Sequence, residues 1–412
     1  MDRLINTVRP YPWGSATALP ALMGTAPDGS PQAELWMGAH PGAPSRVERG
    51  GRMRGLDRII EEDPRGELGD AVVRRFGQRL PFLVKLLAAD APLSLQVHPD
   101  RARAAAGYEL ENARGIPLDA PHRTYRDPQH KPEMIVALTP FEGLCGFRPP
   151  RESAGLLDGL ELDWSAPYAR KLRSAPEEPA LREVFSAFLS LSPGRLADVG
   201  GALASAARRP GPLREEFAVY DRLARAYPGD PGVPAALLVR HVRLTPGEAL
   251  FLGAGVPHAY LRGLGVEIMA ASDNVLRCGL TNKHVDVPEL LRVVRFTALP
   301  TPVVHPVREG DGEEVYPAPV DDFRLSRLVC DAGDRPRVLP GSRPQILVCT
   351  EGTIRLTGSG GEVVLAAGGS AYVPAREEVT VSGAGTVFRA TTAPQGTFRA
   401  ATAPEDRQLN PN

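Results

Sequence analysis

The first 150 residues of the chain consist largely of short apolar runs that end at glycine, proline or a polar cluster, as in LPFLVKLL, LSLQVHPD and PEMIVAL. Apolar runs of this length between turn-forming residues are typical of β-strands. One segment differs, because PDRARAAAGYELENARG is rich in alanine and charge and has helical spacing. The sequence therefore predicts a mainly β fold that is interrupted in this part by one helix.

The pattern changes between residues 151 and 233. In EEPALREVFSAFLSL, apolar residues recur at steps of three and four, which places them on one face of a helix. SPGRLADVGGALASAA begins with Ser192 as a candidate N-cap and Pro193 at the first helical position, and PLREEFAVYDRLARAY repeats the amphipathic spacing. We interpret this part as an α-helical insertion.

Strand-like runs return in AALLVRHVRLTPGEALFLGAGVPHAYL and GVEIMAASD, and a proline-rich passage then precedes a last series of short, evenly spaced runs. Such a series is typical of a sandwich or jelly roll. The predicted organisation is a first barrel at 1–150 and 234–300, the helical insertion at 151–233, a linker at 301–321, a second barrel at 322–400 and a disordered tail at 401–412.

The balance of charge restricts the possible partners. With 48 basic and 49 acidic residues among 412, the formal net charge is -1, so the chain has no overall attraction for nucleic acid or for an anionic membrane. The N-terminal MDRLINTVRPYPWG lacks the basic and apolar segments of a secretory signal, and no run is apolar enough to span a bilayer. We expect a monomeric, soluble, cytoplasmic protein with a small-molecule partner, whose four widely spaced cysteines stay reduced.

Lysine is rare and unevenly placed. Of the 48 basic residues only Lys85, Lys131, Lys171 and Lys283 are lysines, and three of them lie in LPFLVKLL, HKPEM and TNKHVD. An ammonium group acts as a point charge and can lose its proton when desolvated, whereas a guanidinium stays charged. The placement favours a catalytic use of these three segments; surface lysines that lie there by chance are the alternative.

Two stretches share one skeleton, which indicates an internal repeat. In PGEALFLGAGVPHA, Gly247 is followed by Gly253, Gly255 and His258, and in AGGSAYVPAREEVT the matching positions are Gly368, Pro374, Arg376 and Val379. The spacing resembles the second motif of the cupin superfamily, in which the histidine binds a metal inside the barrel. We therefore predict two cupin barrels, of which the second has valine in place of the histidine and carries no metal.

Other polar residues in strand-like runs complete a candidate metal site. Gln96 and His98 in SLQVHPD are two residues apart, so a strand places both side chains on the same face. QHKPEM offers His130 and Glu133 as a further source, and a carboxylate beside imidazole nitrogens is a suitable zinc environment. With His258 the proposed set is Gln96, His98, Glu133 and His258, although any one of these histidines alone is more often structural.

Several long motifs, in order along the chain, carry a specific resemblance. YPWGS, AELWMGAHPGAPS, LPFLVKLL, LSLQVHPD, HKPEM, PHAYL and EIMAASDNVLRCGLTNKHVDV span most of residues 9–288 and are similar to motifs of the type I mannose-6-phosphate isomerase family. The resemblance implies two cupin jelly-roll barrels and one zinc ion per chain. It also implies interconversion of mannose 6-phosphate and fructose 6-phosphate, which serves GDP-mannose formation and mannosylation or mannose catabolism.

Carried over by position, the family's zinc ligands fall on the four residues proposed above. The resemblance further implies an active-site cleft that includes Trp13, Ser94, Lys85, Lys131, Tyr260, Glu267, Asp273, Arg277 and Lys283. One departure from the cupin pattern is Gly253, which stands where cupins generally have proline.

Moving a carbonyl between neighbouring carbons needs a base, charge stabilisation for the enediolate and a phosphate anchor. We assign proton transfer to Lys131, Glu267 or Asp273 and leave open which of them moves the proton. Arg277 is expected to stabilise the enediolate or the phosphate, because its planar donors suit oxyanions. The expected substrate contacts are Trp13, Ser94, Lys85, Tyr260 and Lys283. An alternative for Glu267 and Asp273 is that they only form ion pairs that orient Arg277 and the lysines.

Two other functions remain open from the residues alone. An iron-dependent cupin oxidase or dioxygenase would share the barrel, but a glutamine ligand beside lysines and arginines fits a phosphosugar better. A non-enzymatic sugar-binding bicupin would need no cluster of titratable groups beside the metal, which HKPE and NVLRCG supply. The nucleotide-binding patterns GxGxxG and GxxxxGK[ST] do not occur in strand contexts, so we predict no nucleotide-binding role.

Overall fold

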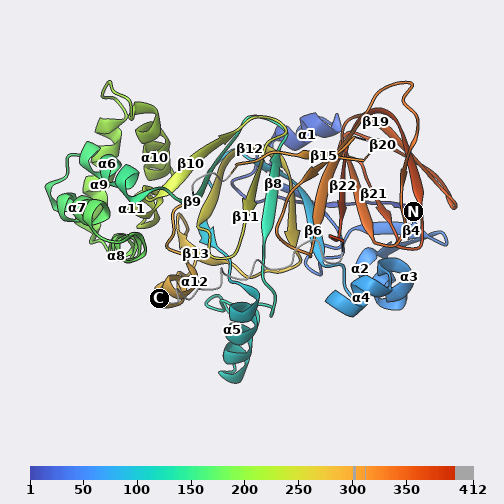
Figure 1. Ribbon diagram of the computed structural model, residues 1–412, viewed down its shortest axis with the longest axis horizontal. Coiled ribbons are helices and arrows are strands. Elements are labelled where there is room, and N and C mark those ends of the chain that lie inside the picture. Colours follow the sequence, from blue (N-terminus) through green and yellow to red (C-terminus); the bar gives the residue numbers. More distant parts are fainter. Residues whose placement is uncertain (300–302, 311, 395–412) are drawn as a thin grey trace, which may run out of the picture.

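The computed structural model describes residues 1–299, 303–310 and 312–394, and the predicted disordered tail at 401–412 lies outside them. Three bodies follow one another along the longest axis: a helical body, a sheet in the centre and a second sheet at the other end (Figure 1). The pairs of named strands are antiparallel throughout both large sheets. The predicted mainly β fold with a helical insertion is confirmed.

The central sheet has eleven strands, with the order β14-β11-β8-β12-β6-β3-β2 and four further strands paired to this path. They are β2 (Thr7–Arg9), β3 (Glu34–Met37), β6 (Phe82–Ala89), β7 (Leu95–Val97), β8 (Glu133–Ala137), β9 (Phe141–Phe147), β10 (Val239–Leu244), β11 (Ala249–Leu252), β12 (His258–Ala270), β13 (Leu276–Gly279) and β14 (Val303–Val304). The long strand β12 pairs with β6, β7, β8 and β9, so it holds both halves of the sheet together.

The second sheet has nine strands, with the order β1-β21-β19-β22-β17-β16-β15, to which β18 and β20 are added. They are β1 (Asp2–Arg3), β15 (Val307–Glu309), β16 (Glu313–Tyr316), β17 (Arg324–Cys330), β18 (Arg337–Leu339), β19 (Gln345–Gly358), β20 (Gly361–Ala366), β21 (Ser370–Val373) and β22 (Val379–Thr391). A separate hairpin is formed by β4 (Arg46–Arg49) and β5 (Arg52–Gly55).

Helices gather in three places. The helical body at one end of Figure 1 contains α6 (Pro150–Gly159), the 3-10 helix η1 (Asp163–Ser165), α7 (Ala166–Ser174), α8 (Glu177–Leu189), α9 (Pro193–Ala206), α10 (Arg214–Ala226) and α11 (Gly232–Ala236). The N-terminal part contains α1 (Ala18–Met23), α2 (Leu56–Glu62), α3 (Pro64–Leu68), α4 (Asp70–Phe76) and α5 (Arg101–Ala113). The short α12 (Val287–Val293) follows the last long strands of the central sheet. Of the five N-terminal helices the sequence predicted only α5.

Two boundaries differ from the predicted organisation. The segment 301–321 was predicted as a linker, yet β15 and β16 within it pair with each other and extend the second sheet. Its prolines do not prevent this, because Pro306 and Pro317 lie just outside the two strands. The first residues were assigned to the first barrel, but β1 pairs with β21 of the second sheet, with Asp2 opposite Tyr372.

The two repeated stretches adopt the same local structure. Each forms a short strand, a turn and a long strand: β11 and β12 in the central sheet, β21 and β22 in the second. His258 and Val379 are each the first residue of the long strand and both are buried. A polar ligand-capable residue in one sheet thus stands where the other sheet has an aliphatic one.

One apolar cluster joins the two sheets. It contains Val84 and Ile268 from the central sheet together with Tyr316 and Phe388 from the second, all buried. Burial of this many apolar side chains between two sheets is the main force that holds them together. Among the described residues, no helix is long and apolar enough to cross a membrane, and the four cysteines are buried and unpaired.

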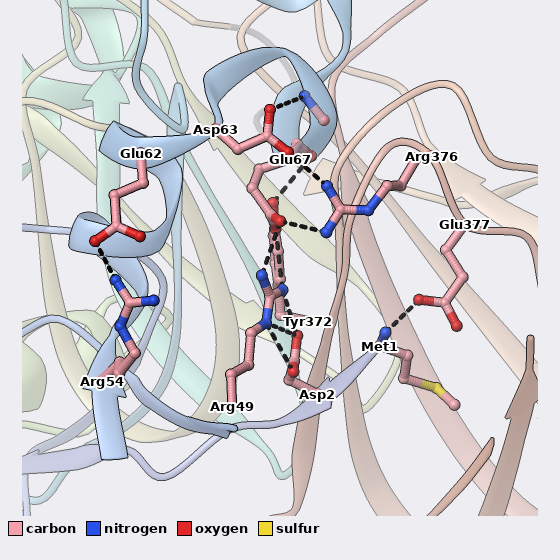
Figure 2. A network of polar contacts seen from close by, with 11 residues as sticks. Met1, Asp2, Arg49, Arg54, Glu62, Asp63, Glu67, Tyr372, Arg376 and Glu377 are labelled. Atoms are coloured by element: carbon pink, nitrogen blue, oxygen red, sulfur yellow. Dashed lines mark hydrogen bonds and ion pairs between the residues drawn. The ribbon is translucent and has the colours of Figure 1, made fainter. Parts of the chain in front are cut away.

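A buried carboxylate adds a polar contact between the N-terminal part and the second sheet (Figure 2). Glu67, in α3, is almost fully buried; its Oε1 accepts hydrogen bonds of 2.8 Å from Arg49 and of 2.8 Å from Arg376, which lies between β21 and β22. The hydroxyl of Tyr372 in β21 donates to the backbone carbonyl of Glu67 at 3.0 Å. Glu67 therefore connects three segments that are far apart in the sequence.

Glu67→Gln is expected to lower the free energy of unfolding by about 2 kcal/mol, because hydrogen bonds to charged groups contribute ~1.5–3 kcal/mol. Chemical denaturation followed by circular dichroism measures the change. The matched control is Glu62→Gln, which removes the partner of Arg54 at the surface (Figure 2) and should leave the denaturation midpoint unchanged within error. Equal midpoints for both variants would contradict the role given to Glu67.

Candidate metal centre

Strand alternation directs the polar side chains of the central sheet to one face. On β7, Leu95 and Val97 belong to the apolar cluster of the helical body, so Gln96 between them faces the opposite side. On β12, Val266 and Ile268 belong to the cluster shared with the second sheet, so Glu267 faces inward. The sheet thus packs one set of apolar residues against helices and the second sheet, and places the polar residues inside the barrel together with a further set of buried apolar residues.

His98, Glu133 and His258 come together in this interior. Each offers one ligand-capable atom, these atoms lie within 4.8 Å of one another, and all three residues are buried. Glu133 opens β8 and His258 opens β12, while His98 follows β7 directly. Three strand ends therefore position the cluster.

The hydrogen bonds of the two histidines define which ring nitrogen is free. His98 Nδ1 lies 2.7 Å from the carbonyl oxygen of Asn274, and His258 Nδ1 lies 2.9 Å from that of Val256. A carbonyl oxygen can only accept, so each Nδ1 carries the proton and donates. Burial lowers the pKa of His98 to about 4, so its ring is neutral at neutral pH and Nε2 presents a lone pair.

Three hydrogen-bond acceptors consequently face one another. Glu133 Oε2 lies 3.3 Å from Nε2 of His98 and 3.3 Å from Nε2 of His258. His98 Nε2 and Glu133 Oε2 are buried and have no hydrogen-bond partner among the described residues. Buried acceptors without donors are costly unless a cation lies between them. Two imidazole nitrogens and one carboxylate oxygen form a donor set that fits zinc.

Gln96 lies at the edge of this cluster. It is opposite His258 in the pairing of β7 with β12, and its amide Nε2 is 3.4 Å from His258 Nε2. The two ends of an amide are assigned from their partners, and a rotated amide would turn its oxygen toward the same space. The structure thus brings together all four residues that the sequence proposed as metal ligands.

Lys131 lies beside the carboxylate of the cluster. Its Nζ is 3.1 Å from Glu133 Oε1, the oxygen that the histidines do not approach, and both residues are buried. Burial opposes ionisation of Glu133, but the positive charge of Lys131 holds the pKa of this carboxyl well below its usual range. Glu133 is therefore an anion at neutral pH.

Lys85, Glu267 and Tyr260 form a second buried group next to the cluster. Lys85 and Glu267 are opposite each other in β6 and β12, with Lys85 Nζ 2.9 Å from Glu267 Oε2. The hydroxyl of Tyr260 donates to Glu267 Oε1 at 2.9 Å. Burial lowers the pKa of Lys85, but the carboxylates of Glu267 and Glu34 outweigh it and raise the pKa above its ordinary value, so the ammonium stays charged.

Arg277 and Lys283 lie in a region of positive charge. Arg277 is opposite Gln96 in the pairing of β13 with β7, which places it at the cluster. Burial lowers the pKa of Arg277, as does the charge of Arg126; for Lys283, burial and the charges of Arg277 and Arg126 act in the same direction. Within the described part of the chain, no carboxylate forms an ion pair with any of the three. Such a group of unpaired cations suits an anion.

Three other predicted site residues have no direct contact with the cluster. Asp273 is exposed and pairs with His40 at 3.3 Å, a contact that lowers the pKa of Asp273. Trp13 stacks on Tyr11, with the ring centroids 5.6 Å apart, and Ser94 is half-buried one residue before β7. In residues 1–299, 303–310 and 312–394 no hydrogen bond or ion pair joins any of them to the converging ligand atoms.

The sequence analysis missed supporting residues, of which Asn274 is the most connected. Its side chain accepts from the backbone N–H of Arg126 at 2.7 Å and donates to the carbonyls of Asp127 and Gln129, and its own carbonyl holds His98. The available sequence signal was that Asn274 directly follows the predicted site residue Asp273. Glu34 was also missed. It lies two residues before Trp36 on β3, and a strand places residues two apart on the same face.

His130 is not part of the cluster, although QHKPEM left it open as a ligand. Its Nε2 lies 2.8 Å from Asp322 Oδ2, on the side that faces the second sheet. Of the two candidates in that motif, only Glu133 reaches the histidines.

Comparison with known proteins identifies the family of this chain. A family model described as phosphomannose isomerase type I, catalytic domain, matches residues 1–150. The mannose-6-phosphate isomerase of Escherichia coli strain K12 is 42% identical over 394 residues, which cover 94% of this chain and 99% of that protein. The chain belongs to the type I mannose-6-phosphate isomerase family. The resemblance inferred from the motifs is thereby confirmed.

Members of this family from distant organisms also match. The mannose-6-phosphate isomerase of Macaca fascicularis is 33% identical over 376 residues, which cover 85% of this chain and 86% of that protein. A crystal structure of a point mutant of phosphomannose isomerase from Salmonella typhimurium has a TM-score of 0.89 at 39% identity, covering 96% of this chain and 100% of that one. A mannose 6-phosphate isomerase structure described as holo and zinc bound has a TM-score of 0.88 at 39% identity, covering 95% and 99%.

Proposed function

We propose that the chain is a zinc-dependent aldose-ketose isomerase that interconverts mannose 6-phosphate and fructose 6-phosphate. The observation that carries the proposal is the convergence of two imidazole nitrogens and one carboxylate oxygen in a buried space, where His98 Nε2 and Glu133 Oε2 have no hydrogen-bond partner among the described residues. The substrate is supported by relatives that share most of their length with this chain and are mannose-6-phosphate isomerases, and zinc-bound structures at 39% identity support the metal.

Gln96, His98, Glu133 and His258 are proposed to hold the zinc ion. When bound, zinc would supply positive charge that favours the anionic form of a sugar during proton transfer. The hydrogen bonds from the two Nδ1 atoms support the assignment, since they fix the orientation of both rings.

Proton transfer is proposed for Lys131 or Glu267. Lys131 lies beside Glu133, and Glu267 is a buried carboxyl whose pKa burial raises toward the range useful for acid-base chemistry. Asp273 is the weakest of the three candidates, because it is exposed and engaged with His40. The hydrogen bond from Tyr260 and the ion pair with Lys85 would orient the carboxylate of Glu267.

Arg277 is proposed to stabilise the enediolate or the phosphate, and Lys283 and Ser94 to contact the phosphate. The mutual repulsion among Arg277, Lys283 and Arg126 supports this, because an anion would relieve it. Trp13, Lys85 and Tyr260 remain proposed substrate contacts. We further propose that the chain acts as a cytoplasmic monomer, and light scattering would test its oligomeric state. The proposed domain boundaries are those predicted from the sequence, except that residues 1–3 and 307–316 belong to the second sheet.

The decisive experiment follows fructose 6-phosphate formed from mannose 6-phosphate by the wild-type protein, by a chelator-stripped sample, and by the same sample after zinc is restored. Zinc content is measured in parallel. We expect activity to disappear on stripping and to return with zinc. A folded, zinc-loaded protein without activity would refute the isomerase, and binding of mannose 6-phosphate in that case would point to a sugar-binding sensor.

A further inference from the structure

The segment that precedes β17 of the second sheet makes a polar contact with the proposed active-site region of the central sheet. Asp322 lies two residues before β17 and is buried. Its carboxylate lies 2.8 Å from His130 Nε2 and 3.2 Å from Arg101 Nη2. Arg101 is the first residue of α5, and His130 lies in the loop before β8, so both partners belong to the N-terminal part of the chain. The contact crosses between the parts that build the two sheets.

The loop that carries His130 leads directly to the proposed active site. His130 is followed by Lys131, whose ammonium lies 3.1 Å from Glu133. Residues 126–131 form no helix or strand. Their position therefore depends on side chains that hold the loop from outside. Asn274 holds its first half, through the backbone of Arg126, Asp127 and Gln129.

Asp322 holds the second half of the loop by charge. Arg101 Nη2 lies 2.7 Å from His130 Nε2 and donates to Asp322 at 3.2 Å, while the carboxylate of Asp322 lies 2.8 Å from the same ring nitrogen. The guanidinium, the imidazole and the carboxylate therefore form one closed group, in which the carboxylate attracts Arg101 and keeps the ring of His130 against it. Burial opposes ionisation of Asp322, yet His130 and Arg101 hold the pKa of its carboxyl below the usual range, so the anion is present at neutral pH.

We infer that Asp322 is a positioning residue for the reaction: it holds His130 beside Arg101 and thereby fixes Lys131 next to Glu133. The inference rests on the proposed function and gives the second sheet, which lacks the metal-binding histidine, a part in catalysis. A displacement of about 1 Å in a catalytic group can cost about 100-fold in rate. Loss of the anion should displace the loop because the carboxylate then no longer holds Arg101 and the ring of His130 together.

The test compares Asp322→Asn with two matched controls. Asp321→Asn removes the neighbouring carboxylate, which pairs with Arg75, and Glu67→Gln weakens another polar contact between the two parts. We expect D322N to lower kcat about 10- to 100-fold, as for other residues that orient a metal site, with KM changed less than about twofold. Both controls should keep wild-type kcat and KM. Wild-type kcat in D322N, or an equal loss of kcat in E67Q, would overturn the inference.

A second pair of variants tests the same contact from the other side. His130→Ala removes the ring that contacts Asp322 and Arg101 and should reproduce the loss of kcat, whereas His130→Gln keeps a side-chain amide that can bond to either partner and should restore most of it. Wild-type kcat in H130A would overturn the inference even if D322N does not fold.

A readout without turnover separates this inference from the proposed function. Competition with a chelator measures the zinc dissociation constant. We expect it to increase about 10-fold in D322N and H130A and to stay unchanged in D321N. If the wild-type protein binds zinc but does not isomerise mannose 6-phosphate, the proposed function fails while this comparison still tests the positioning role. An unchanged dissociation constant in both D322N and H130A would then overturn it.

Discussion

His258→Ala is expected to lower kcat/KM for mannose 6-phosphate by about 100- to 1,000-fold. His258 Nε2 faces Glu133 Oε2 at 3.3 Å, both residues are buried, and alanine offers no nitrogen to take its place. A metal contributes several kcal/mol of charge stabilisation, and each ~1.4 kcal/mol corresponds to a factor of ten in rate.

Zinc content decides how a loss in this variant is interpreted. We expect His258→Ala to hold less than one zinc per chain at a concentration that saturates the wild type, by elemental analysis after gel filtration. His305→Ala is the matched control, because His305 is exposed and outside the cluster. A folded His258→Ala protein with full zinc content and near wild-type turnover would remove this histidine from the proposed ligand set.

Lys85→Met is expected to lower the free energy of unfolding by about 3–5 kcal/mol near neutral pH, the usual effect of removing one partner from a buried ion pair. Methionine keeps the length of the side chain, so the effect arises mainly from charge. Glu267, at 2.9 Å, and Glu34, at 3.6 Å, would stay buried without their cation. Urea denaturation followed by circular dichroism measures the difference.

The same variant has a distinctive pH dependence. Burial raises the pKa of Glu267 and the charge of Lys85 opposes this, so without Lys85 the folded chain binds this proton more tightly than the unfolded one and the stability of the variant rises as the pH falls. The wild-type pair behaves differently: the pKa of Lys85 is raised on folding, so its contribution is complete below the unfolded pKa and is lost only as the pH rises through the folded value. The deficit of the variant should therefore shrink as the pH falls.

Two further variants isolate the charge effect. Lys85→Met with Glu267→Gln should recover part of the lost stability, because one uncompensated charge is removed. Lys171→Met is the surface control, since Lys171 pairs with Glu183 where both are exposed, and its midpoint should stay near that of the wild type. A deficit for Lys85→Met that is independent of pH would contradict the proposed burial of unpaired carboxyls.

The sequence by itself determined the fold class and the family. Short apolar runs predict strands because their alternation has a period of two, and this period also predicted that Gln96 and His98 share one face. The long motifs identified the family because they are extended and ordered along the chain. Local spacing of this kind survives in the sequence, since it concerns residues that are neighbours along one strand or turn.

Only the tertiary structure decided the contacts between distant residues that no motif had predicted. QHKPEM offered two possible ligands, and the loop that contains it has no periodicity from which side-chain directions could be read; the fold turns His130 toward Asp322 and Glu133 toward the two histidines. The buried pairing of Lys85 with both Glu267 and Glu34 depends on the register of three strands. The prolines of 301–321 predicted a linker, but β15 and β16 form because an open edge of the second sheet is available to pair with them. These contacts are determined by long-range pairing, which leaves no local pattern in the sequence.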